Sequence, residues 1–134
     1  MIGFELQKFC RAYMREFPDL PIRYGQFAVL EILCNGVRGM TPMQIADMLH
    51  VSRPMIAAHL GVLQADGFVV RVASPDDGRS VYILPTKKAQ KLVDKTKQDL
   101  EKIHAVLIQK MGQKKFETFV RLAYMAKEIL SDQL

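Results

Sequence analysis

The chain has 134 residues, of which 49% are hydrophobic and 25% are charged, a composition that suits one globular domain able to bury a core. The two cysteines, Cys10 and Cys34, form no CxxC pair and have no companion cluster of metal-ligating side chains, which argues against a disulfide scaffold and a structural zinc site. No apolar run is long enough to cross a bilayer and the first residues lack the pattern of a secretory signal, so we expect a cytoplasmic protein without a membrane partner.

The charge of the chain is positive but unevenly distributed. The formal net charge of +5 suits a nucleic-acid partner, because lysine and arginine neutralise phosphates. Residues 41–88 carry five basic and four acidic side chains, whereas residues 89–134 carry nine and six. The excess therefore falls mainly near the end of the chain, where a solvated lysine-rich helix face explains it equally well.

Two helices are predicted at the start of the chain. Over residues 2–17 apolar side chains recur every three or four residues, as on one face of a helix. Pro18 and Pro21 separate this segment from a second helix over about residues 22–34. The pair Asn35-Gly36 would end the second helix, because both residues tolerate the left-handed conformation. The stripe of the first helix consists of Ile2, Leu6, Phe9, Tyr13 and Phe17.

The strongest helix start in the sequence is at Thr41. This threonine is followed by a proline at the first helical position and by Gln44 three residues later, the pattern of a capping box. The third helix runs to about residue 49, and residues 50–51 leave only a short turn before Ser52 caps a fourth helix. Two short helices joined so tightly form a helix-turn-helix. The inward stripe of the fourth helix consists of Ile56, Leu60 and Leu63.

After the fourth helix the hydrophobic period changes to two. Residues 68–73 and 81–84 alternate as strands do, and the polar SPDDGRS between them contains a glycine, so we predict a β-hairpin. Thr86 then caps a long helix that ends at Gly112, and a last helix covers about residues 114–130. The inward positions of these two helices are Ala89, Val93, Thr96, Leu100, Ile103 and Leu107, and Phe116, Phe119, Ala123, Ala126 and Leu130.

The order of these elements predicts a mainly α fold with a small β-hairpin wing, a winged helix-turn-helix with helical additions at both ends. From VSRPMIAAHLGVLQADGFVVRVASPDDGRSVYILPTKKA and the flanking helices, the chain resembles the MarR family of transcriptional regulators. The resemblance implies a single domain over residues 1–134. In it residues 36–85 would form the DNA-binding core, and residues 1–35 and 86–134 would form dimerisation helices.

The resemblance also implies a partner and a set of contacts. The protein would bind double-stranded DNA as a homodimer at a pseudo-palindromic operator, as a repressor that responds to a ligand or to stress. The helix that starts after Ser52 would enter the major groove, and Arg79 of the wing would reach the minor groove with Asp77 orienting its guanidinium. The expected DNA contacts are Thr41, Ser52, Arg53, Pro54, Met55, Ala57, Ala58, His59, Asp77, Arg79 and Ser80.

The groove-facing side of the fourth helix is unusually small and apolar. Opposite its inward stripe lie Pro54, Ala58, Gly61 and Ala65, which cannot hydrogen-bond to base edges through their side chains. We therefore expect specificity to come largely from DNA shape, wing insertion and half-site spacing. The bare surface also leaves an alternative open, a winged-helix adaptor that binds protein and has weak or no DNA binding.

The effector of such a regulator is less well indicated. Members of the family commonly release DNA when a small lipophilic or phenolic ligand binds, or when a cysteine of the first helix is oxidised. Cys10, Tyr13 and Tyr24 are the candidates for an effector or redox site, although a free cysteine is usually inert packing. We predict no catalytic residue, metal or cofactor, because no nucleophile–base pair, phosphate loop or metal-ligand cluster is evident, which also argues against an ArsR-like metal sensor.

Overall fold

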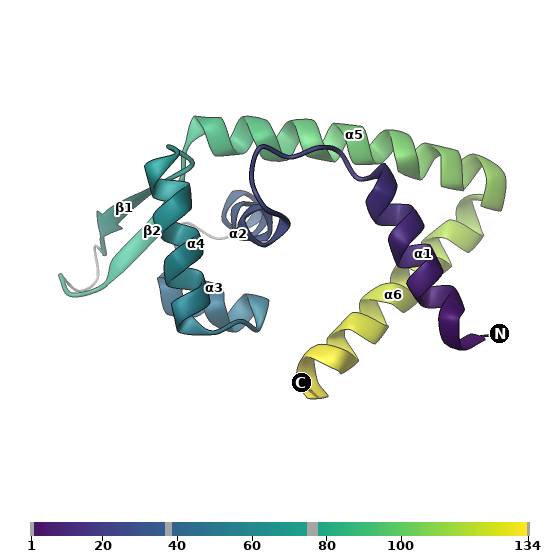
Figure 1. The fold of residues 1–134 in the computed structure, drawn as a ribbon, viewed down its shortest axis with the longest axis horizontal. Coiled ribbons are helices and arrows are strands. Elements are labelled where there is room, and N and C mark those ends of the chain that lie inside the picture. Colours follow the sequence, from purple (N-terminus) through teal and green to yellow (C-terminus); the bar gives the residue numbers. More distant parts are fainter. Residues whose placement is uncertain (1, 37–38, 75–77, 134) are drawn as a thin grey trace. The chain divides into compact units, whose positions relative to one another are not determined.

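A computed structural model describes residues 2–36, 39–74 and 78–133, which form helices and one hairpin (Figure 1). The mainly α fold with a two-stranded antiparallel wing is confirmed. No helix in the described ranges is long and apolar enough to span a membrane. The elements are α1 (Ile2–Glu16), α2 (Tyr24–Asn35), α3 (Pro42–Leu49), α4 (Arg53–Ala65), β1 (Val69–Ala73), β2 (Val81–Pro85), α5 (Lys87–Met111) and α6 (Gln113–Gln133).

The chain divides into two compact units. Residues 20–95, here called the reader unit, contain α2, α3, α4, the hairpin and the start of α5. Residues 1–19 and 96–134, here called the terminal unit, contain α1, the rest of α5 and α6. Helix α2, which the sequence led us to group with the dimerisation helices of residues 1–35, packs on α3, α4 and β2. The division of the chain into dimerisation helices and a DNA-binding core stays a prediction.

The reader unit has a continuous apolar core. Among the described residues, every fully buried apolar side chain lies in this unit. The inward stripe predicted for α4 is confirmed, since Ile56, Leu60 and Leu63 are each no more than 1% exposed. The other buried apolar side chains are Phe27, Val29, Leu30, Leu33, Ile45, Ala46, Phe68, Val69, Ile83, Ala89 and Val93. Burial of this set on the hydrophobic faces of several short elements holds the unit together.

The ends of α2 and α3 follow local rules with one exception. Thr41 and Gln44 form the predicted capping box, with Gln44 N–H donating to Thr41 Oγ1 over 3.2 Å and Thr41 N–H donating to Gln44 Oε1 over 2.9 Å. His50 ends α3 in the left-handed region, at φ 55° and ψ 45°, and makes the turn to α4. Helix α2 ends at Asn35, as predicted. Gly36, however, is extended at φ −98° and ψ −169°, so the helix does not end in the left-handed conformation that this glycine would tolerate.

The hairpin is tied to both neighbouring helices. Strands β1 and β2 pair antiparallel with Val69 opposite Pro85, and Ile83 N–H also donates to the Met40 carbonyl over 2.8 Å. The predicted cap Thr86 accepts from Ala89 N–H over 3.3 Å, and its hydroxyl lies 2.7 Å from the Gly67 carbonyl. These contacts fix the wing with respect to the end of α4 and the start of α5.

The terminal unit is held by a small aromatic cluster. Phe9 of α1 meets Phe119 of α6 edge to face, with ring centroids 5.0 Å apart. Tyr13 and His104 are joined by a hydrogen bond of 2.8 Å between the hydroxyl and Nε2. No residue of α1 is fully buried, and Leu130, predicted on the inward side of the last helix, is 58% exposed. The inward face expected for α6 is therefore only partly covered within one chain.

Candidate nucleic-acid interface

Helix α4 presents one face to the core and the opposite face to solvent. Pro54, Ala58, Gly61 and Ala65 are all exposed, as the spacing of the inward stripe predicted. Arg53 is exposed at the first helical position. The exposed face therefore combines one guanidinium at the start of the helix with small apolar side chains along its length.

The start of α4 is held by its own side chains. Ser52 Oγ accepts the N–H of Met55 over 3.2 Å, and Pro54 has no N–H to offer. The first turn therefore presents fewer backbone donors to a phosphate than a helix without proline and cap would. Met55 is 48% exposed in this turn, and Ala57 is also exposed.

His59 differs from the other predicted contacts of α4, because it is half-buried against α2. Its Nε2 lies 3.1 Å from the position that a Cβ on Gly25 would occupy, so the imidazole packs on the first turn of α2. A larger residue at position 25 would displace the ring. The histidine therefore lies at the edge of the exposed face of α4, next to the start of α2.

Two more of the predicted contact residues lie in the wing. Arg79 is exposed just before β2, and the Ser80 carbonyl accepts the N–H of Ser74 over 2.9 Å. Asp77, expected to orient the Arg79 guanidinium, lies outside the described residues. Arg71 of β1, which was not predicted from the sequence to have a role, donates through Nε to Gln64 Oε1 over 2.8 Å and joins the wing to the end of α4.

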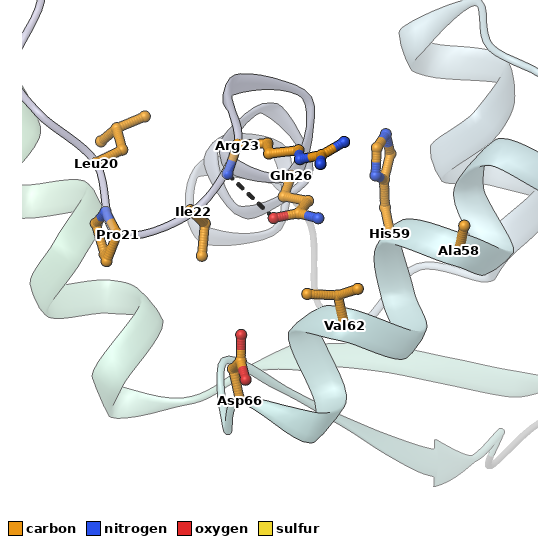
Figure 2. Close-up of a pocket in the computed structure, with 9 residues that line it drawn as sticks. All are labelled: Leu20, Pro21, Ile22, Arg23, Gln26, Ala58, His59, Val62 and Asp66. Atoms are coloured by element: carbon orange, nitrogen blue, oxygen red, sulfur yellow. Dashed lines mark hydrogen bonds between the residues drawn. The ribbon is translucent and has the colours of Figure 1, made fainter.

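A hollow of about 630 Å³ lies beside α4 on the side of α2 (Figure 2). Arg23, which directly precedes α2, and Gln26 of α2 line it together with Ala58, His59 and Val62 of α4. Arg23 N–H donates to Gln26 Oε1 over 3.1 Å, which orients the amide at the start of α2. Asp66, at the end of α4, also lines the hollow. The hollow thus places polar groups next to the exposed face of α4.

The candidates for an effector or redox site fall in different units. Cys10 is exposed on α1, and Tyr13 belongs to the aromatic cluster of the terminal unit. Tyr24 is 55% exposed in the first turn of α2, in the reader unit. Burial, with a smaller effect of the Asp94 carboxylate, raises the pKa of the Cys34 thiol. In the described part of the chain, no three His, Cys, Asp or Glu side chains are grouped so that they could hold a metal.

The tight turn between α3 and α4 and the hairpin behind them define a winged helix-turn-helix. The MarR family pattern matches residues 19–80, a little under half of the chain. This match confirms, over these residues, the resemblance to the MarR family found in the sequence.

Solved structures of similar fold are transcriptional regulators. PA4135 is 28% identical over 96% of this chain and 97% of its own, with a TM-score of 0.75. FabT of Streptococcus pneumoniae, crystallised with DNA, is 19% identical over 98% and 95%, with a TM-score of 0.81. NadR, crystallised with 4-hydroxyphenylacetate, is 20% identical over 94% and 92%, with a TM-score of 0.72. No curated protein shows significant sequence similarity to the chain.

Proposed function

We propose that this protein is a sequence-specific DNA-binding transcriptional regulator. The observation that carries the proposal is the exposed face of α4, which stands clear of the core beside the wing and begins with Arg53. A helix about 10 to 12 Å wide fits the major groove, and a wing arginine fits the adjacent minor groove. FabT was crystallised with DNA in the same fold, which supports this assignment of α4 and the wing.

The proposed contacts are drawn from the set predicted from the sequence. Arg53, Pro54, Met55, Ala57 and Ala58 would face the groove, and Arg79 and Ser80 would act from the wing. Thr41 and Ser52 would act mainly by capping the two helices of the motif, because their hydroxyls accept backbone N–H groups. With so few polar groups on α4, the operator would be distinguished chiefly by its shape and spacing.

The regulator would act as a homodimer on a pseudo-palindromic operator and would repress until an effector releases it. Two reading helices can meet one duplex a helical turn apart only when two copies combine about a two-fold axis. The crystal structure of NadR with 4-hydroxyphenylacetate supports a small phenolic or lipophilic effector in this fold. Cys10 as an alternative redox sensor rests on its exposure on α1 alone.

The experiment is selection of bound duplexes from a random pool, followed by titration of a selected and a scrambled duplex at several salt concentrations. A regulator binds the selected duplex at least about a thousandfold more tightly than the scrambled one, and both affinities fall as salt rises. The alternative, a winged-helix adaptor for a protein partner, predicts no enriched sequence and no salt-dependent slope. That outcome would overturn the proposal.

A further inference from the structure

The hollow beside α4 has the chemistry of an anion site. We infer that Arg23, Gln26 and His59 bind a phosphate of the DNA backbone where it passes the flank of α4. This inference rests on the proposed function and adds a contact from α2, whereas the expected contacts lie on α4, its cap, the start of α3 and the wing. Four observations carry it: the start of α2, the Gln26 amide, the side chains of Arg23 and His59, and the position of the hollow.

The first turn of α2 differs from those of α3 and α4. In α3 and α4 a proline removes one backbone N–H, and Thr41 or Ser52 takes another. Helix α2 has no side-chain cap, no proline and no acidic residue in its first turn. Because the N-terminal amides of a helix carry a partial positive charge, the start of α2 offers more to an anion than the other two.

The amide of Gln26 points to a ligand independently of the helix end. The residue is only 8% exposed, and its oxygen is held by Arg23 N–H over 3.1 Å. This bond turns the Nε2 end towards the hollow, where no described residue accepts from it (Figure 2). The side chain is thus held in place by one bond, while its Nε2 group is open to the hollow and can donate to an acceptor that enters it.

Two basic side chains complete the set. The guanidinium of Arg23 carries five N–H donors and cannot cap a helix, and no ion pair holds it in the described parts of the chain. His59 projects from α4 towards the same side of the hollow, against Gly25 (Figure 2). The acidic residue of the hollow, Asp66, follows His59 by seven residues, which is about 10 Å along a helix. The anion would therefore bind at the His59 end.

The position of the hollow favours a DNA phosphate over a free anion. Ala58 and Val62 line it and also belong to the exposed side of α4. Because the helix nearly fills a major groove about 12 Å wide, its flanks lie close to the phosphates that border the groove. A duplex bound to α4 would thus bring a phosphate to Arg23, Gln26 and His59.

The first test is the Arg23→Gln variant with Arg15→Gln as its control. Both changes remove one positive charge, but Arg15 is an exposed residue of α1 in the terminal unit. Affinity for both selected and scrambled duplexes is measured between 50 and 200 mM salt. Arg23→Gln should weaken binding to both by roughly tenfold at low salt and reduce the slope of log affinity against log salt by about one. Arg15→Gln should change neither quantity.

The second test is Gln26→Glu, which separates stability from binding. A glutamate at this position keeps the acceptor for Arg23 N–H and suits the helix dipole, so the melting temperature should hold or rise. Its carboxylate would meet the phosphate, so DNA affinity should fall by at least about tenfold. Wild-type affinity and slope in both variants would overturn this inference alone. Absence of salt-dependent DNA binding by the wild type would overturn the proposed function as well.

Discussion

The backbone conformation at position 39 requires a glycine. It adopts a positive φ of 62°, and a Cβ added there would lie 2.7 Å from Cδ2 of the Tyr82 ring. Gly39→Ala combines left-handed strain with a collision, so we expect a loss of about 2 to 3 kcal/mol in the free energy of unfolding. Gly61→Ala is the matched control, because Gly61 is helical with nothing within 4 Å of its added Cβ.

The control change should raise stability by up to about 1 kcal/mol, because alanine has the higher helix propensity. Urea denaturation of both variants, followed by circular dichroism, measures the difference. Equal stabilities of the two variants would contradict the strain assigned to Gly39.

Cys34 illustrates a residue whose chemistry is set by its surroundings. Burial and the neighbouring Asp94 raise the pKa of its thiol, and the thiolate is the form that reacts with alkylating agents. In a Cys10→Ser variant, where Cys34 is the remaining thiol, alkylation at pH 8 should be roughly tenfold slower than in the unfolded chain. The rate should keep rising with pH beyond the range in which an ordinary cysteine levels off. Mass spectrometry of timed samples checks this, and native and unfolded rates that agree at every pH would refute it.

At the scale of single elements, the role of the wing can be tested directly by mutation. Arg79→Ala removes the guanidinium expected in the minor groove, so we predict a loss of about 2 kcal/mol in DNA affinity. Ala58→Ser changes one small side chain on the exposed face of α4 and should cost less than about 0.5 kcal/mol. Fluorescence anisotropy on a selected duplex measures both, with melting temperatures to show that the folds are intact. Comparable losses in the two variants would contradict the proposed division between wing and helix.

The helices and strands could be predicted from the sequence where their signals are local. Thr41, Ser52 and Thr86 all cap as predicted, since a cap depends on residues within one turn. Tertiary partners could not be predicted in the same way. The Arg71 bond to Gln64 joins a strand to a helix, and the packing of His59 on Gly25 joins two helices, so no pattern within one element encodes either contact. Arg23 was missed for the same reason.

At the scale of the whole molecule, the two units differ in how much apolar surface one chain can bury. The reader unit contains every fully buried apolar side chain among the described residues. Both units leave some large apolar side chains in solvent, but more of these lie in the terminal unit than in the reader unit. Exposed apolar surface of this extent marks an interaction site. The exposed set of the terminal unit is Ile2, Phe4, Leu6, Met14, Val106, Met111, Val120, Leu122, Tyr124, Met125, Ile129 and Leu130.

Helix α1 carries an apolar stripe that a second copy could cover in the proposed homodimer. Ile2, Leu6, Phe9 and Tyr13 share one face by their spacing, but only the second half of this stripe is covered within the chain. Phe9 and Tyr13 pack in the aromatic cluster, whereas Ile2 is 87% exposed and Leu6 is 67% exposed. In the proposed homodimer the partner would cover the first half of the stripe.

Leu6→Asp tests this arrangement against Gln7→Asp, an adjacent change of equal charge about 100° around the helix. Loss of a buried leucine and burial of a carboxylate should raise the dimer dissociation constant by at least about 100-fold, or roughly 3 kcal/mol. Gln7→Asp should leave it within about threefold of the wild type, because its side chain lies off the stripe. Light scattering over a dilution series measures both constants. A Leu6→Asp protein that stays dimeric at the same dilution as Gln7→Asp would show that the partner covers another face, and it would leave the apolar end of α1 without a dimer role.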